Sequence, residues 1–149
     1  MSYEFLDYRA LDAMTRDPVT LGPGASLAEA EALLERHDFN ALPVVGADGK
    51  LLGIVTKLDL LRAFRFDDKH MFPPYEEIMA RPVREVMATD LTTVTPRSPL
   101  TRVLETLVRL RTKSLPVVED EKVVGMIARE DVLQALRRAV AGERARGPI

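Results

Sequence analysis

Two short stretches of this chain carry an aspartate three residues after a small or hydroxyl-bearing residue. They are Thr56-Lys57-Leu58-Asp59 and Ala128-Arg129-Glu130-Asp131, and each directly follows an apolar run. If a helix begins there, its free backbone N–H groups, the Thr56 hydroxyl and the Lys57 charge suit a phosphate. The aspartate suits the two hydroxyls of a ribose. Thr56 and Asp59 fit a helix cap equally well, and the residues leave both interpretations open.

The two stretches belong to an internal repeat. Alignment of Met14 with Met87 gives an offset of 73 residues, and Leu42–Val45 then matches Leu115–Val118. One residue is lost in a turn, after which Gly53 matches Gly125 at an offset of 72. A repeat of this density indicates one structural unit used twice.

The first copy predicts a strand, a helix, two further strands and a helix. A short extended segment covers 19–21, and Ser26 is placed to cap a helix that runs to His37. Its apolar face holds Leu27, Ala30, Leu33, Leu34 and His37. Asp48-Gly49 predicts a hairpin of strands over 42–45 and 51–56, with the last helix beginning near Lys57.

The second copy predicts the same order of elements. Pro99 precedes a helix whose apolar face holds Leu100, Val103, Leu104, Leu107 and Leu110. A hairpin over 115–118 and 122–128 follows, and the last helix begins near Arg129. Each copy of about 55 residues is too small to bury its apolar surface alone, so we expect the two to pack together.

Composition narrows the possible functions. The chain has 149 residues, 46% apolar and 30% charged, with a formal net charge of −2 and no cysteine. Disulfides, thiolate nucleophiles and thiolate metal sites are therefore excluded. No apolar run approaches the roughly 18 residues of a membrane span, and no secretion signal is present, so we expect a cytoplasmic protein. The basic cluster at the chain end (Arg137, Arg138, Arg144 and Arg146) is interpreted as a solvated helix end and tail rather than a nucleic-acid contact.

The Leu-Pro-Val-Val strand, the hairpin and the Gly-apolar-apolar-(Ser/Thr)-x-x-Asp pattern, repeated in tandem, resemble a pair of CBS domains, or Bateman module. The resemblance implies an α/β fold of two motifs, each β-α-β-β-α, packed pseudo-symmetrically over 10–63 and 83–140. An apolar linker (64–82) and a flexible basic tail (141–149) complete the chain. The linker is expected to pack across the module, with a subunit or partner surface as the alternative.

The resemblance also implies a ligand: an adenosyl compound such as AMP, ADP, ATP or S-adenosylmethionine, in clefts between the two motifs. It makes Asp59 and Asp131 the ribose-binding carboxylates and Thr56 a phosphate-side hydroxyl. It places Ile54, Val55, Met126 and Ile127 against the base. The remaining candidate ligand-binding residues are Lys57, Arg129, Thr20, Thr93, Asn40 and Lys113.

Ala128 departs from the family pattern, because it has no hydroxyl to cap a helix or to bond a phosphate. Arg129 could partly replace that hydroxyl as a charged donor. We therefore expect unequal sites, with the one around Thr56 and Asp59 binding a nucleotide phosphate better.

The sequence favours a regulatory module that binds an adenosyl ligand, forms a homodimer and signals to a separate partner protein. The alternative is a structural or dimerisation module that binds no small molecule, and a nucleic-acid-binding role ranks third. No catalytic set can be placed by spacing, so an enzyme is not expected. His37 and His70 lack the neighbours of a metal site, and no metal is expected either.

Overall fold

The computed structural model describes residues 4–65 and 74–145 of the chain. These residues divide into two compact units. Unit 1 combines Met1–Pro18 with Thr92–Ile149, and unit 2 is the continuous stretch Val19–Leu91. Within the described ranges, no helix combines the length and the apolar character needed to cross a bilayer.

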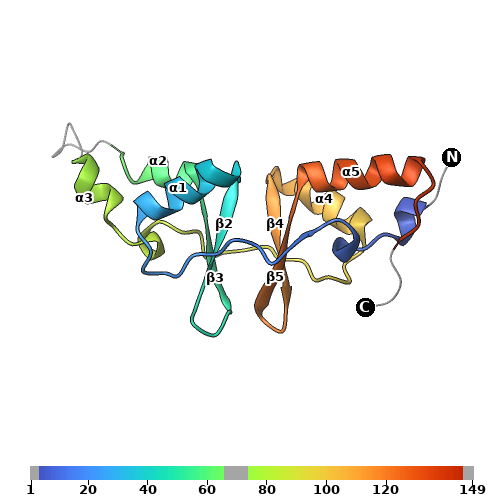
Figure 1. The fold of residues 1–149 in the computed structure, drawn as a ribbon, viewed down its shortest axis with the longest axis horizontal. Helices are drawn as coiled ribbons and strands as arrows, with labels where there is room; N and C mark the ends of the chain where they lie inside the picture. Colours follow the sequence, from blue (N-terminus) through green and yellow to red (C-terminus); the bar gives the residue numbers. More distant parts are fainter. Residues whose placement is uncertain (1–3, 66–73, 146–149) are drawn as a thin grey trace. The chain divides into compact units, whose positions relative to one another are not determined.

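Unit 2 contains the first hairpin and its helices (Figure 1). Helix α1 (Leu27–His37) leads into strands β2 (Ala41–Val45) and β3 (Leu51–Thr56), and α2 (Lys57–Arg62) follows β3 directly. A further helix, α3 (Tyr75–Met79), and a 3-10 turn (Val83–Glu85) complete the unit. The core includes the buried side chains of Leu27, Leu34, Leu42, Val44 and Val55.

Unit 1 repeats this arrangement with the second hairpin (Figure 1). Helix α4 (Leu100–Leu110) precedes strands β4 (Ser114–Glu119) and β5 (Lys122–Ala128), and α5 (Arg129–Val140) follows β5. The two-residue strand β1 (Thr15–Arg16) pairs with the free edge of β5, giving the antiparallel sheet order β1-β5-β4. Two 3-10 turns (Glu4–Asp7 and Ala10–Asp12) lie before β1.

The segment that precedes each copy of the repeat packs in the unit of the other copy. In unit 1 the Leu100 amide donates to the Tyr8 carbonyl at 2.9 Å, and in unit 2 the Leu27 amide donates to the Arg81 carbonyl at 3.0 Å. The equivalent bonds show that the two units share one backbone plan. Each compact unit of the structure therefore combines one copy of the repeat with the segment that precedes the other copy.

Gly53 and Gly125 are the positions where these segments cross their hairpins. A Cβ at Gly53 would lie 2.8 Å from the Ala88 carbonyl oxygen, and one at Gly125 would lie 2.8 Å from the Thr15 carbonyl oxygen. A methionine side chain, Met87 or Met14, fills the remaining space above each glycine. The absence of a side chain at both glycines is therefore required for close approach of two backbones.

Several sequence expectations need correction. His37 is exposed rather than core-facing, because α1 ends there and the left-handed Asp38 turns the chain away. Leu110 is likewise 42% exposed at the end of α4. The expected strand over 19–21 is reduced to a single bridge between Leu21 and Val44.

The expected linker contains ordered structure where the chain is described. Phe64 packs against the core of unit 2, and Ile78 and Met79 of α3 are buried in it. Residues 66–73 of the expected linker, which include His70 and Phe72, lie outside the described residues, as does the chain end 146–149.

Candidate functional site

In unit 2, Thr56 and Asp59 bond to each other at the start of α2. The Thr56 amide and hydroxyl both donate to Asp59 Oδ2, at 2.8 and 2.9 Å, and the Asp59 amide donates to Thr56 Oγ1 at 3.2 Å. This is a complete capping box, so the capping interpretation of the pair is confirmed. The bonds also hold the Asp59 carboxylate in one orientation at the end of β3.

Arg62 is a site residue that the sequence analysis missed. Its Nη1 lies 3.3 Å from Asp59 Oδ1, so both carboxylate oxygens of the buried Asp59 have partners. The spacing of three residues on a helix was the available signal, since such residues are neighbours on a helix surface.

In unit 1, Asp131 has fewer partners than Asp59. Its Oδ2 accepts one hydrogen bond, from the Ala128 amide at 2.7 Å. Burial raises the pKa of the Asp131 carboxyl above its ordinary value; the bond from Ala128 lowers that pKa and the charge of Glu130 raises it further. The Asp131 side chain is half-buried, and its second carboxylate oxygen has no partner among the described residues.

Arg129 serves a different purpose from the one its sequence position suggests. Its Nε donates to the Thr112 carbonyl and its Nη2 to the Arg111 carbonyl, both at 3.0 Å. Arg111 has a left-handed backbone (φ 54°) at the end of α4, where helix carbonyls lack partners. The guanidinium thus bonds the end of α4, and these two donors are not available to a phosphate.

The apolar candidates divide according to the alternation of side chains along a strand. Val55 and Ile127 are fully buried in the cores of their units, whereas Ile54 and Met126 are half-exposed. A ligand can touch only the exposed pair, so we drop Val55 and Ile127 from the candidate site. Lys57 is exposed at the start of α2.

The four remaining candidates lie beside the hairpins. Asn40 directly precedes Ala41, which pairs with Thr56, and the Lys113 carbonyl accepts a bond from the Arg129 amide at 3.1 Å. Thr20 and Thr93 are exposed and lie next to β2 and β4, on the edges away from β3 and β5. Each unit therefore brings its own candidates to one hairpin.

No group of three or more potential metal-ligating side chains occurs in the part of the chain that the structure describes. His37 stacks on Phe39 with ring centroids 5.0 Å apart, which is a packing contact.

Comparison with protein families gives matches in both copies of the repeat. The family model described as "CBS domain" matches residues 9–65 and 83–138. Among curated proteins, the chain is 29% identical over 134 residues to an A-adding tRNA nucleotidyltransferase from Aquifex aeolicus, and covers 15% of that protein. It spans 22% of the length of the next two curated relatives that it matches.

Two solved structures share the fold over nearly their whole length. The structure of CBSX2 in complex with AMP is 25% identical, with a TM-score of 0.75 over 88% of this chain and 97% of that one. The CBS domain pair of protein MJ0100, in complex with methylthioadenosine and S-adenosyl-L-methionine, is 26% identical, with a TM-score of 0.71 over 87% and 95%.

Proposed function

Because this chain belongs to the CBS-domain family, we propose that it is a regulatory module that binds an adenosyl ligand. The observation that carries the proposal is the equivalent placement of Asp59 and Asp131, each in the first turn of the helix that follows its hairpin. Two similar structures hold AMP or S-adenosyl-L-methionine, which supports a ligand of this class. In the proposal the two carboxylates bind ribose hydroxyls, and Ile54 and Met126 contact the base.

The two halves are proposed to differ in their affinity for phosphate. The exposed Lys57 supplies a cationic amine next to Asp59, whereas the Thr56 hydroxyl already donates to Asp59 Oδ2 and reaches a phosphate only by giving up that bond. Next to Asp131, Ala128 supplies no hydroxyl and two donors of Arg129 are bonded to carbonyls. A ligand with a phosphate tail should therefore prefer Asp59, while a nucleoside without phosphate should tolerate Asp131.

A thermal-shift panel with AMP, ADP, ATP, S-adenosylmethionine and NAD tests the ligand class. A compound at a hundredfold its dissociation constant should stabilise the fold by about 2.7 kcal/mol. No shift with any of the five compounds would contradict the proposal.

Calorimetric titration of variants tests the assigned residues. Asp59→Asn should weaken AMP binding by about tenfold, the effect of one lost charge-assisted hydrogen bond. Glu130→Gln removes an exposed carboxylate of the same helix turn as Asp131 and is the matched control for Asp131→Asn. Unchanged AMP affinity in both aspartate variants would remove these residues from the site.

We further propose that the ligand acts by favouring one arrangement of the chain, which a separate partner protein then recognises. A ligand can shift such an equilibrium only through different affinities for the two arrangements. Nucleotide-dependent capture of a partner protein in a pull-down with and without AMP would test this step.

A second candidate function, dimerisation, has its own observation. Apolar side chains are exposed on α4 and α5 of unit 1 (Val108, Leu133 and Val140 at 69%, 54% and 82%) and on α2 of unit 2 (Leu58 and Leu61 at 55% and 68%). Exposed apolar side chains on neighbouring helices mark interfaces, so we propose a homodimer through α4 and α5 of unit 1. Analytical ultracentrifugation should show a dimer that Leu133→Glu dissociates; a monomeric wild-type chain would contradict it.

A further inference from the structure

The cap of each helix start uses the same oxygen of its aspartate. In unit 2 the Thr56 amide donates to Asp59 Oδ2 at 2.8 Å, and in unit 1 the Ala128 amide donates to Asp131 Oδ2 at 2.7 Å. Oδ1 is therefore the oxygen that the cap leaves for a ligand in both units. An ionised carboxylate has about four acceptor positions, two on each oxygen, so a free Oδ1 can accept from both hydroxyls of a ribose.

In unit 2 this oxygen is occupied by Arg62. The Arg62 Nη1 lies 3.3 Å from Asp59 Oδ1, and the side chain of Asp59 is 6% exposed whereas that of Arg62 is 61% exposed. With the two bonds from Thr56 to Oδ2, three of the about four acceptor positions of Asp59 are filled. A ribose at Asp59 must therefore compete with a charged guanidinium.

In unit 1 the equivalent position holds Gln134, because Arg62 and Gln134 each follow the aspartate by three residues. Gln134 is exposed on α5 and carries no charge, and in the described part of the chain no hydrogen bond links it to Asp131. Asp131 Oδ1 has no partner among those residues, so a ribose there displaces no ion pair. The same carboxylate is thus paired in one unit and open in the other.

The Arg62 guanidinium also changes the charge that a ligand meets. Helix α2 carries two cations, Lys57 and Arg62. The same positions of α5 hold Arg129, whose Nε and Nη2 are bonded to carbonyls, and the neutral Gln134. A phosphate is attracted by the charge of Arg62, whereas an uncharged nucleoside only loses the oxygen that Arg62 occupies.

We propose that Arg62 makes the Asp59 site prefer nucleotides over nucleosides, so that a nucleoside without phosphate binds first at Asp131. This proposal rests on the adenosyl function proposed above and names the residue that divides the ligands between the two units. Arg62 is a positioning residue, because it acts through Asp59 and occupies Oδ1 until a ligand displaces it. Displacement costs little, since an ion pair with an exposed partner is weak.

The test is an NMR titration of the full chain with adenosine and with AMP, followed at two equivalent backbone amides. Leu58 precedes Asp59 and Glu130 precedes Asp131, so each amide reports one site. With adenosine, the dissociation constant should be at least about threefold lower at Glu130 than at Leu58, which is the contribution of one weak ion pair. With AMP this difference should shrink or reverse.

Exchanging the two residues tests the assignment directly. Arg62→Gln should strengthen adenosine binding at Leu58 about threefold and AMP binding by less, with no change at Glu130. Gln134→Arg should weaken adenosine binding at Glu130 about threefold. Arg36→Gln is the matched control, because it removes another exposed arginine of unit 2, on α1, and should change neither affinity. Wild-type-like amide spectra would show that each variant is folded.

Salt provides a second measurement that needs no substitution. Adenosine is uncharged, so added salt acts on its binding mainly by screening the ion pair of Arg62 with Asp59. Higher salt should therefore strengthen adenosine binding at Leu58 and leave binding at Glu130 unchanged. A salt-independent affinity at Leu58 would contradict the role of the ion pair.

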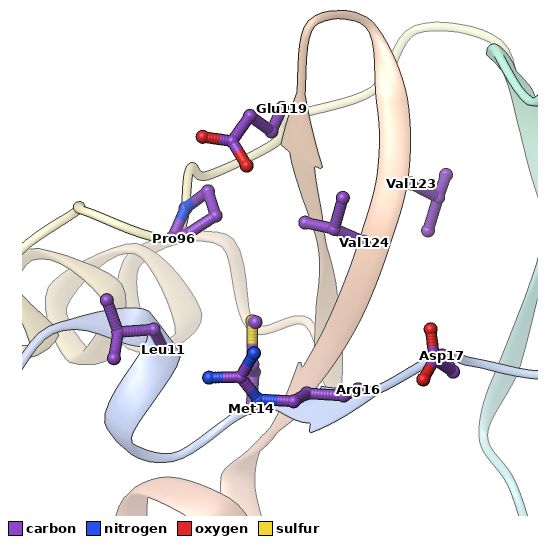
Figure 2. A pocket seen from close by; sticks show the side chains of 8 residues that line it. All are labelled: Leu11, Met14, Arg16, Asp17, Pro96, Glu119, Val123 and Val124. Atoms are coloured by element: carbon purple, nitrogen blue, oxygen red, sulfur yellow. The ribbon is translucent and has the colours of Figure 1, made fainter. Parts of the chain in front are cut away.

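A cavity of about 290 Å³ in unit 1 gives a competing location for the ligand (Figure 2). Leu11 and Glu119 line this cavity, and Asp131 is not among its lining residues. Adenosine bound there would shift the amides of Leu11 and Glu119 and spare Glu130. That result would overturn the assignment of the nucleoside to Asp131.

The remaining outcomes separate this proposal from the function on which it rests. Equal adenosine affinities at Leu58 and Glu130 in the wild-type chain, or an Arg62→Gln variant with wild-type affinities, would overturn the role of Arg62 and leave the adenosyl function standing. Absence of saturable shifts with both adenosine and AMP would contradict the adenosyl function itself and the role of Arg62 with it.

Discussion

The two aspartates that the repeat places in equivalent positions have different surroundings. Asp59 is bonded by the amide and hydroxyl of Thr56 and by Arg62, whereas Asp131 accepts one bond from the Ala128 amide. A single change, from threonine to alanine at the cap, removes both bonds that a hydroxyl makes. Asp59 therefore contributes more to its helix start than Asp131 does, and it has less hydrogen-bonding capacity left for a ligand.

The two equivalent aspartates therefore have different roles. Asp59 contributes to folding through its capping box, and a ligand at Asp59 must share or replace existing bonds. Among the described residues, Asp131 has an oxygen without a partner, and burial raises its pKa, so Asp131 gains more from a new hydrogen-bond donor. The two copies share a backbone plan and differ in how many hydrogen bonds the aspartate carboxylate already makes.

If both copies share one backbone plan, Gly53 and Gly125, where a segment crosses each hairpin, should be equally intolerant of a side chain. Their substitution gives the largest expected effect. Gly53→Ala and Gly125→Ala each place a methyl group against a backbone carbonyl and a methionine. Each should lower the free energy of unfolding by about 3 kcal/mol, as overpacking does. Urea denaturation measures both; tolerance of one substitution and not the other would show that the two crossings differ.

The unequal bonding of the aspartates gives the next largest effect. Asp59→Ala leaves the buried cap without its acceptor and should cost about 2–3 kcal/mol, while Asp131→Ala should cost about 1 kcal/mol. Chemical denaturation of the two variants in parallel gives the difference. Equal losses would contradict the view that Asp59 contributes more to the fold.

Exchanging the caps tests the hydroxyl itself. Thr56→Ala should lower the stability by about 1 kcal/mol, and Ala128→Thr should raise it by about the same amount because α5 gains a side-chain acceptor. Thermal and urea unfolding provide the measurement. A destabilising Ala128→Thr would mean that the site around Asp131 has no room for the larger side chain.

The smallest effect is a pH dependence. Because the folded pKa of Asp131 lies above its ordinary value of 3.8, the folded chain holds that proton more tightly than the unfolded chain. The resulting stability is present below pH 3.8 and is lost as the pH rises through the folded pKa. Asp131→Asn should therefore become more favourable, relative to wild type, across that rise. A stability difference that is constant with pH would contradict this.

The repeat predicted most of the secondary structure, because helical periodicity and Asp48-Gly49 are local signals. The starts of α2 and α5 and both hairpins lie where the sequence analysis expected them. The cap of α1 was also expected, and the Glu29 amide donates to Ser26 Oγ at 3.1 Å.

Features that depend on distant contacts were not predictable. The pairing of Thr15 with Met126 joins a two-residue strand to the far end of the chain, and two residues show no periodicity. The use of Arg129 depends on the left-handed Arg111, which no local pattern around Arg129 reveals.

The two units become complete at different stages of synthesis, because unit 2 is one continuous stretch of the chain and unit 1 is made of two separate stretches. All of Val19–Leu91 is synthesised before the later part of unit 1, so unit 2 can fold without waiting for unit 1. The first 18 residues must wait for β5 and α5 before Tyr8 and β1 find their partners. Until β5 and α5 have emerged, the segment 4–18 lacks these partners and is exposed to chaperones and proteases.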